Sequence, residues 1–296
     1  MKNVFIIGGT TFDHIVYLPV LPGIHPQTIH EAPFQEGTGS TGSGKALNLT
    51  KLGVDTILYS VVGDDQYGKE IIRYLQESGV NIFYDIDPKG TERHINIMDA
   101  DGKRISIFIT QSSETINYSI NKIEEQLGLS DIVVLNIISY CRNLIPLINK
   151  SNKPVWTDLH DYDGKNQYHT DFINAAQYIH LSSDNLSDYF SVMKQFINVG
   201  KELVICTHGK DGATLLTKTG ERIDQPAILS YPMSDANGAG DSFFAGFLYG
   251  WINQQSNQRC MQMGAVCAGL CISSKMLAFE FLTPTYLEDE MQRHGF

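Results

Sequence analysis

The sequence predicts an α/β protein with a central, mainly parallel sheet, helices on both faces and a small β-sheet lid. Short apolar runs rich in β-branched residues alternate with amphipathic stretches, which is typical of a parallel sheet covered by helices. Hydrophobic residues make up 42% of the chain, enough for a sizeable buried core. The length of 296 residues suits one large domain or two modest ones, and we expect a single domain at residues 1–296.

Six short apolar runs are expected to be strands of the main sheet: residues 4–7, 56–62, 132–136, 155–158, 178–181 and 203–207. Three stretches between them carry apolar residues at spacings of three and four, which predicts helices: residues 45–52, 67–78 and 184–196. An apolar stretch near the C-terminus, residues 243–251, also has helical character.

Two regions, residues 14–38 and 91–110, break this rhythm because they alternate apolar and polar residues without helical periodicity. The second contains Asp101-Gly102 between alternating apolar residues, which is a strong hairpin signal. We expect these regions to form a few strands apart from the main sheet, as a lid. An edge hairpin of the main sheet is the alternative interpretation.

Composition excludes several classes of protein. The net charge of −11 argues against a general nucleic-acid surface, which normally needs a basic patch. The 5 cysteines contain no Cys-x-x-Cys pair, and their odd number favours buried thiols in a reducing, cytoplasmic setting. No apolar segment approaches the ~18 residues that cross a membrane, and the N-terminal apolar run is too short for a signal peptide.

The most informative segment is Asp235–Phe247, which reads DANGAGDSFFAGF. Its glycine-rich turn leads directly into the C-terminal helical stretch, so unblocked amides and the helix dipole would attract an anion, phosphate above all. Asp241 lies at the mouth of this site, where a carboxylate can take a proton from a hydroxyl that attacks a phosphoryl group. A plain loop with a helix cap is the alternative interpretation.

Two further segments place polar groups after predicted strands. Asp13 follows the first strand, at the end of the sheet where α/β proteins bind ligands, although an aspartate that merely forms a turn fits as well. Thr207, Gly209 and Gly212 form a Thr-x-Gly-x-x-Gly pattern that can bring amides and a hydroxyl to a nucleotide phosphate. A tight turn between two strands is the alternative for this pattern.

The glycine cluster at residues 37–44 nearly matches a phosphate-binding P-loop when Lys45 is included. Ala46 stands where a Ser or Thr would hold Mg²⁺, and the preceding polar stretch contains Pro33 and is no buried strand. We therefore do not expect a P-loop here.

In this order, the segments resemble the ribokinase (PfkB) family of carbohydrate and nucleoside kinases. The family signature Asp-Thr-x-Gly-Ala-Gly-Asp-x-Phe-x-Ala-Gly-Phe differs here only at Ala236, and Val62–Gly68 resembles the family element Val-Gly-x-Asp-x-x-Gly. The resemblance implies a ribokinase-like fold with a β-sheet lid that is a dimer contact in many members. It implies the following roles: catalytic base, Asp241; anion hole, Gly238, Ala239 and Gly240; nucleotide binding, Thr207, Gly209 and Gly212; substrate binding, Asp13, Gly39, Gly42 and Ser43.

The chain departs from the family pattern at several positions. If Leu52-Gly53 fixes the register, the usual substrate-binding Asn falls on Gly44. The family's Asn-x-x-Glu, which acts on Mg²⁺ through water, is missing. The nearby acids Asp184 and Asp188 are explained equally well as acids at a helix N-terminus. Asp158 ends a strand that closes with Asp-x-Asn in the family, and here His160 replaces the Asn.

The resemblance implies a kinase that transfers the γ-phosphoryl group of ATP to a hydroxyl of a sugar or sugar-like small molecule. Mg²⁺ bound with ATP is the implied cofactor, a monovalent cation is a further expectation, and the residue that positions the metal stays open. The implied partners are ATP, a small polyol, sugar or nucleoside, and a second copy through the lid. A nucleoside kinase of the same fold and a non-catalytic ligand-binding relative are the alternative functions.

Overall fold

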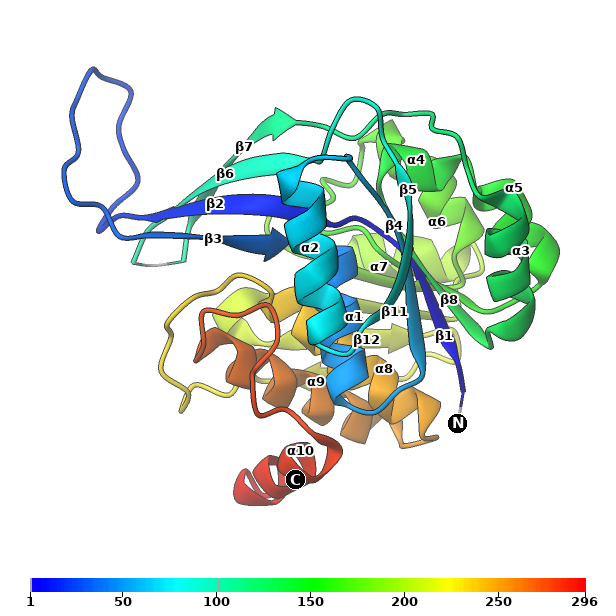
Figure 1. Cartoon of the computed structure of the whole chain (residues 1–296). Coiled ribbons are helices and arrows are strands. Elements are labelled where there is room, and N and C mark those ends of the chain that lie inside the picture. Colours follow the sequence, from blue (N-terminus) through cyan, green and yellow to red (C-terminus); the bar gives the residue numbers. More distant parts are fainter. Residues whose placement is uncertain (1, 101) are drawn as a thin grey trace.

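The computed structural model describes residues 2–100 and 102–296, and its main sheet has 9 strands in the order β13-β12-β11-β10-β9-β8-β1-β4-β5 (Figure 1). All neighbouring strands from β5 to β11 are parallel, and β12 and β13 are antiparallel at one edge. The strands are β1 Val4–Ile7, β4 Thr56–Val62, β5 Asn81–Ile86, β8 Ile132–Asn136, β9 Val155–Asp158, β10 Tyr178–Ser182, β11 Leu203–Thr207, β12 Ala213–Thr217 and β13 Arg222–Gln225. The predicted parallel sheet is therefore confirmed.

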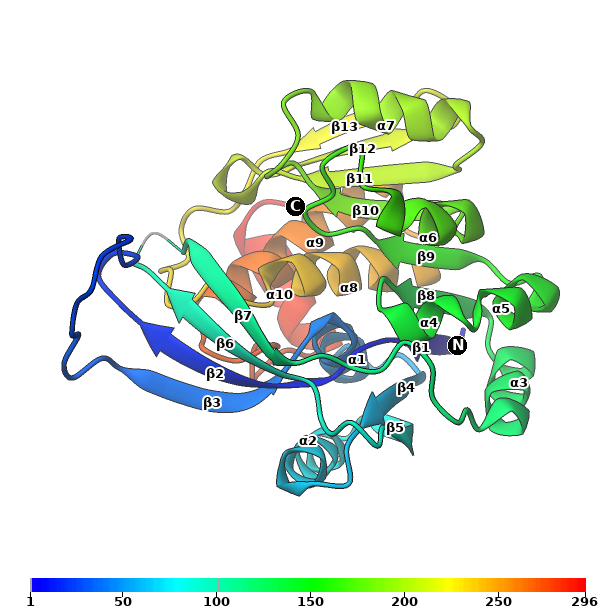
Figure 2. The ribbon, with the colours of Figure 1, turned by 90° about the horizontal axis from the view of Figure 1, so that it is seen from above.

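Helices cover both faces of this sheet (Figure 2). One face carries α1 Thr41–Lys51, α2 Gln66–Glu77, α8 Ala239–Ile252 and α9 Asn257–Ile272, with α10 Pro284–Arg293 packed on α9. The other face carries α3 Ile120–Leu129, α4 Ser139–Arg142, α5 Ile145–Ser151, α6 Thr170–Ala175 and α7 Tyr189–Asn198. Two short 3₁₀ turns, η1 Gln167–His169 and η2 Gly209–Asp211, complete the chain.

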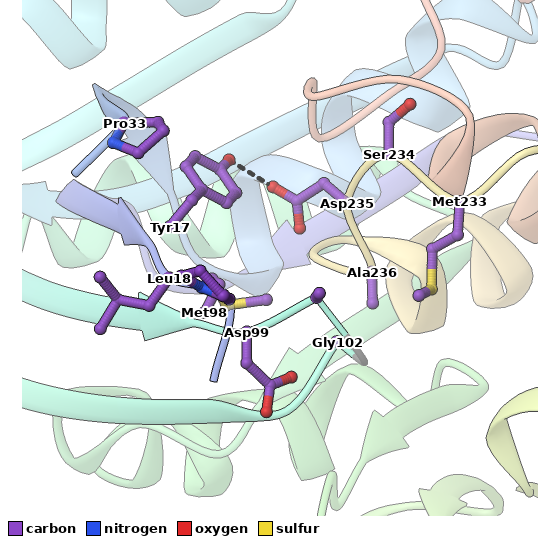
Figure 3. Close-up of a pocket in the computed structure, with 12 residues that line it drawn as sticks. Tyr17, Leu18, Pro33, Met98, Asp99, Gly102, Met233, Ser234, Asp235 and Ala236 are labelled. Atoms are coloured by element: carbon purple, nitrogen blue, oxygen red, sulfur yellow. Dashed lines mark hydrogen bonds between the residues drawn. The ribbon is translucent and has the colours of Figure 1, made fainter. Parts of the chain in front are cut away.

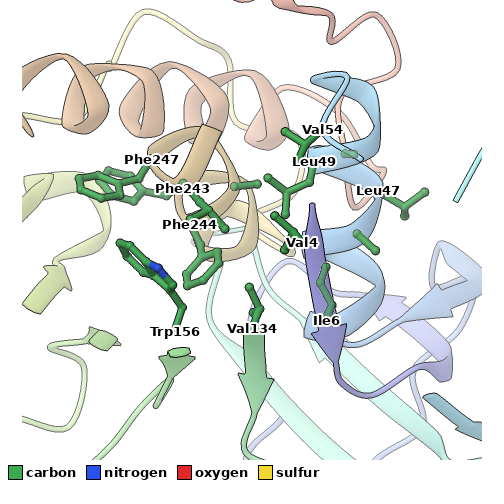
Figure 4. Close-up of a cluster of buried hydrophobic side chains, with 14 of the residues drawn as sticks. Val4, Ile6, Leu47, Leu49, Val54, Val134, Trp156, Phe243, Phe244 and Phe247 are labelled. Carbon is green, nitrogen blue, oxygen red and sulfur yellow. The ribbon is translucent and has the colours of Figure 1, made fainter. Parts of the chain in front are cut away.

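Side-chain alternation along each buried strand divides the core between the two faces. In β1, Val4 and Ile6 join the cluster under α1 and α8, whereas Phe5 and Ile7 join the cluster under α3, α4 and α5. Figure 4 shows the first cluster, where Trp156 of β9 lies against Phe244 and Phe247 of α8 at ring-centre distances of 5.9 Å. Each buried aromatic or aliphatic side chain of this kind contributes about 1.5–3 kcal/mol, so α8 is held firmly against the sheet.

The two irregular regions form a second sheet of 4 strands, in the order β3-β2-β6-β7. Its strands are β2 Thr11–Tyr17, β3 Phe34–Gly39, β6 Arg93–Met98 and β7 Arg104–Thr110. The alternative of an edge hairpin on the main sheet is wrong, because β6 pairs with β2 rather than with a strand of the main sheet. Asp101 of the predicted turn lies outside the described residues, and its neighbour Gly102 has a φ of +80°.

Three expected boundaries differ from the structure. The helix expected at 184–196 begins only at Tyr189, because the Asp188 side chain caps it by accepting a hydrogen bond from the Ser191 amide. The helix expected from residue 45 begins at Thr41. Asp13 does not follow β1 as a loop residue, since the chain leaves β1 through Gly8 and Gly9 and enters β2 at once. Among the described residues, no helix is both long and apolar enough to span a bilayer.

Candidate active site

The Gly-Ala-Gly-Asp run forms the N-terminus of α8, as the sequence indicates. Gly238 is the N-cap residue with a φ of +81°, a left-handed conformation that favours glycine. The Ala239 amide donates to the Ala236 carbonyl oxygen at 3.3 Å, whereas within the described part of the chain the Gly240 and Asp241 amides have no backbone acceptor. Together with the helix dipole, these open amides make the turn suited to an anion.

Asp241 lies in the first turn of α8 with its side chain only 10% exposed. Its Oδ1 accepts a hydrogen bond from Lys45 Nζ at 2.5 Å, and the same ammonium lies 2.9 Å from Oδ2 of Asp158. The Lys45 side chain is fully buried and also lies over the Phe244 ring, 4.9 Å from its centre. One ammonium therefore joins a residue of α1, the end of β9 and the start of α8.

Lys45 and Asp158 hold each other in their ionised forms. Burial disfavours an ammonium, but the Asp158 and Asp241 carboxylates hold the pKa of Lys45 above its ordinary value. Burial likewise disfavours an ionised Asp158, yet Lys45, His160 and His180 hold the pKa of its carboxyl well below its ordinary value. The nearest ring nitrogen, Nδ1 of His180, lies 3.1 Å from Asp158 Oδ1.

Asp13 lies near the start of β2 in the small sheet, where it is 5% exposed. Its carboxylate accepts hydrogen bonds from Thr11 Oγ1 at 2.7 Å and from Asn96 Nδ2 at 3.1 Å. Burial raises the pKa of Asp13 above its ordinary value, against the hydrogen bond from Thr11 and the charges of His94 and Arg104. A carboxylate held this firmly by β2 and β6 can accept hydrogen bonds from the hydroxyls of a bound polyol.

The predicted glycines connect the two acidic centres. A Cβ on Gly39 would collide with the Asp13 carboxylate, and a Cβ on Gly42 would collide with the Gly9 carbonyl oxygen. At Gly44 a Cβ would lie 2.6 Å from Asp241 Oδ2. Because β3 ends at Gly39 and α1 begins at Thr41, one short segment of chain touches both Asp13 and Asp241. Ser43 is fully buried, and its hydroxyl has no hydrogen-bond partner among the described residues.

Thr207, Gly209 and Gly212 form the turn between β11 and β12, so the alternative of a tight turn describes their local structure. Gly212 has a φ of +99°, and a Cβ there would collide with the Gln225 carbonyl oxygen, which explains this glycine structurally. The turn lies at the carboxyl ends of the parallel strands, where Thr207 neighbours Ser182 of β10 and His180 of β10 neighbours Asp158 of β9. It is therefore on the same edge of the sheet as the Asp158–Lys45–Asp241 cluster.

A cavity of about 390 Å³ lies between the small sheet and the loop before α8 (Figure 3). Its walls combine apolar side chains with carboxylates and include Tyr17, Leu18, Met98, Met233 and Asp235. Two hydrogen bonds between described residues cross from the small sheet to the loop. Tyr17 donates its hydroxyl to Asp235 Oδ2 at 2.7 Å, and Arg104 donates to Asn237 Oδ1 at 3.3 Å.

In the described part of the chain, the two acids considered for Mg²⁺ form no hydrogen bond or ion pair with Lys45, Asp158 or Asp241. Asp188 is the cap of α7, and Asp184 is an exposed residue of the turn before it. Among the described residues there is no group of 3 or more His, Cys, Asp or Glu side chains arranged for a metal ion.

Sequence reasoning missed three functional candidates that the structure brings into the site. Lys45 was visible only as part of a P-loop-like pattern, and its real partners lie 113 and 196 residues away. Asn96, which donates to Asp13, and Tyr17, which donates to Asp235, stand in strand-like stretches that carry no motif. No local signal marks Lys45, because the same helix also carries the polar residues Asn48 and Thr50.

Comparison with known proteins agrees with this architecture. The sequence profile described as "pfkB family carbohydrate kinase" matches residues 1–283. The acarbose 7(IV)-phosphotransferase of an Actinoplanes species is 28% identical over 268 residues, which cover 89% of this chain and 90% of that protein. The ribokinase of Bacillus subtilis is 24% identical, covering 93% of this chain and 94% of that protein.

Solved structures show the same fold. The microbiome-derived acarbose kinase Mak1 superposes with a TM-score of 0.87 at 28% identity, covering 99% of both chains. The ribokinase of Arabidopsis thaliana, solved with ribose and ATP, has a TM-score of 0.80 at 19% identity, covering 98% of this chain and 99% of that one. The chain belongs to the pfkB family of carbohydrate kinases and is a phosphotransferase of sugar or nucleoside hydroxyls with a ribokinase-like fold.

Proposed function

We propose that this protein transfers the γ-phosphoryl group of ATP to a hydroxyl of a sugar, with Asp241 as the catalytic base. The observation that carries the proposal is the buried Asp241 carboxylate at the open N-terminus of α8, next to the same short segment, residues 39–44, that also lies against Asp13. A base and an anion-binding helix start at one place are what an in-line phosphoryl transfer needs.

In the proposed reaction, Asp241 removes the proton from the acceptor hydroxyl as that oxygen attacks the γ-phosphorus. The new O–P bond forms while the bond from the γ-phosphorus to the β–γ bridging oxygen breaks, and ADP leaves with that electron pair. We assign the amides of Gly238, Ala239 and Gly240 to stabilising the negative charge on the phosphates during transfer. The Ala239 amide can do so only after its hydrogen bond to the Ala236 carbonyl oxygen breaks. Mg²⁺ carried by ATP supplies further charge neutralisation.

The two substrates approach this point from opposite sides in our proposal. The Thr207, Gly209 and Gly212 turn, on the carboxyl edge of the main sheet, is assigned to the nucleotide. Asp13, Gly39, Gly42 and Ser43, between the small sheet and α1, are assigned to the acceptor. The small sheet then acts as a lid that excludes water, which otherwise competes as the acceptor.

The acceptor is proposed to be a saccharide longer than one ring. β2 runs from Asp13 to Tyr17 over about 13 Å, so a ring bound at Asp13 leaves the cavity beside Tyr17 for further rings. An aromatic ring beside carboxylates suits the apolar face and the hydroxyls of a sugar. The similarity to an acarbose phosphotransferase and to an acarbose kinase supports the same class.

The test is ADP release from Mg·ATP across free hexoses, sugar phosphates, oligosaccharides, acarbose and nucleosides, with Asp241→Asn in parallel. We expect the highest kcat/KM with an acceptor of two or more rings. We also expect about a 10²- to 10⁴-fold lower kcat in Asp241→Asn, with ATP binding unchanged. Near-normal turnover in that variant contradicts the base assignment, and preference for a nucleoside or a single sugar contradicts the acceptor class. ATP binding without turnover on any acceptor would favour a non-catalytic relative.

A further inference from the structure

The Lys45 ammonium binds two carboxylates, those of Asp241 and Asp158, and lies closer to Asp241. The proposed reaction changes the charge of only one of them. In the reaction Asp241 gains a proton and loses its charge, whereas Asp158 keeps its charge throughout. Lys45 Nζ lies 2.5 Å from Asp241 Oδ1 and 2.9 Å from Asp158 Oδ2, and its side chain is fully buried. A buried ammonium with a single carboxylate would strongly oppose protonation of that carboxylate, because it would be left without a partner.

We propose that Lys45 is a positioning residue that fixes the orientation of Asp241, while Asp158 keeps Lys45 paired when Asp241 takes the acceptor proton. The inference rests on the proposed function, since it concerns the base of that reaction. The Lys45 side chain is fully buried in the core beside Phe244, so it contacts Asp241 from the protein interior and does not contact the acceptor.

Gly44 also contributes to the position of Asp241. A Cβ at residue 44 would lie 2.6 Å from Asp241 Oδ2 and 3.0 Å from its Cβ, so any side chain there would displace the Asp241 side chain. The neighbouring residues of α1 thus act together: Gly44 leaves the space that the carboxylate occupies, and Lys45 holds the carboxylate in it.

Other titratable groups that face the cluster are His160 and His180 beside Asp158, and the buried Cys271 thiol near Asp241. Burial raises the pKa of Cys271 to about 12, so this thiol stays neutral at ordinary assay pH. The two histidines touch Asp158 rather than Asp241, so His180→Gln serves as a control that changes the surroundings of Asp158 and leaves the Lys45–Asp241 contact in place.

The experiment measures protonation of Asp241 directly, by ¹³C NMR of protein labelled at the aspartate carboxyl carbons, with the Asp241 signal assigned through Asp241→Asn. Lys45→Met removes the positive charge, and we expect the Asp241 titration midpoint to move up by about 1 to 3 pH units. Asp158→Asn leaves Lys45 with Asp241 alone, and we expect that midpoint to move down. Lys69→Met is the matched control, because Lys69 pairs with Asp64 on the surface at 3.1 Å and its loss changes no buried charge.

Opposite shifts in Lys45→Met and Asp158→Asn support the inference, with little change in Lys69→Met and His180→Gln. If the Asp241 midpoint moves in the same direction in both variants, or does not move, the inference is overturned. A lysine with a purely structural role would not shift this midpoint in opposite directions in the two variants. If Lys45→Met does not fold, the downward shift in Asp158→Asn decides alone. In the pH profile of kcat, we expect the midpoint on the acid side to move up in Lys45→Met and down in Asp158→Asn. Full activity in Asp241→Asn would instead overturn the proposed base, which is a distinct result.

Discussion

At the scale of single residues, Gly44 stands where the expected register places the family's usual asparagine, and the structure leaves no room for a side chain there. The Asp241 carboxylate occupies the volume that a side chain at residue 44 would need, at 2.6 Å from the position of a Cβ. The next residue, Lys45, then supplies the charge that holds Asp241 there. Beside the proposed base, the chain therefore has a glycine that leaves room for the Asp241 carboxylate, followed by a lysine that binds this carboxylate.

Asp13 provides a prediction at the same scale. Asp13→Ala removes hydrogen bonds from the acceptor hydroxyls to a charged group, worth about 1.5–3 kcal/mol. We expect the KM for the acceptor to rise about 10- to 100-fold, while the KM for ATP changes little. Steady-state kinetics with each substrate varied in turn checks this.

The control is Asp85→Ala, which also removes a buried aspartate but one that binds Tyr59 and Ser119 away from the site. Equal losses for both substrates in Asp13→Ala would mark Asp13 as structural. Because burial raises the pKa of Asp13, acceptor binding should weaken on acidification at a higher pH than an ordinary aspartate requires. The sign follows from protonation, which turns the carboxylate from an acceptor of several hydrogen bonds into a partial donor.

At the scale of elements, β2 connects the two ends of the proposed acceptor site. Asp13 and Tyr17 stand on one face of this strand, because residues two and four apart share a face. Asp13 belongs to the acidic site, while Tyr17 closes the cavity by bonding to Asp235 in the loop before α8. A shift of the small sheet therefore moves the acceptor groups and the start of α8 together.

Tyr17→Phe tests this link, since it removes the hydroxyl that reaches Asp235 and keeps the ring. We expect kcat/KM for the acceptor to fall about 2- to 10-fold, as for one lost hydrogen bond, with a small change in Tm. Hydrogen exchange should rise in residues 233–238. Tyr84→Phe on the exposed side of β5 is the control. An unchanged kcat/KM together with unchanged exchange would show that the contact does not hold the sheet in place.

At the scale of the whole molecule, the small sheet leaves an apolar surface uncovered. β7 is its edge strand, and the alternate residues Ile105, Ile107 and Ile109 are each 39–47% exposed. An edge strand with exposed apolar side chains is a site for pairing with another chain. This supports the proposal that two copies associate through their small sheets.

The corresponding prediction is that the protein is a dimer by light scattering after size exclusion, and that Ile107→Lys shifts it to the monomer. The substitution places a charge in the middle of the apolar row, where burial against a second copy becomes costly. Val199→Lys, at an exposed apolar residue at the end of α7, should leave the dimer intact. A wild-type monomer at micromolar concentration would contradict the proposal.

The sequence by itself determined the fold class, because periodicity and turn residues are local properties that each segment carries alone. The strands at 4–7, 56–62, 132–136, 155–158 and 203–207 have the bounds of the short apolar runs that predicted them, and the start of α8 coincides with the Gly-Ala-Gly-Asp run. The helix expected at 184–196 failed in its first turn, because the Asp188 cap outweighs the apolar spacing before it.

Only the tertiary structure decided which charges meet. Lys45, Asp158 and Asp241 come from α1, β9 and α8, and the contacts of Lys45 span 113 and 196 residues. Tyr17 and Asp235 are 218 residues apart. Such pairs follow from the order of strands in the sheet and from the face on which each helix packs, and no spacing along the chain encodes either. The sequence therefore indicated the proposed base, Asp241, while only the fold showed the lysine that contacts it.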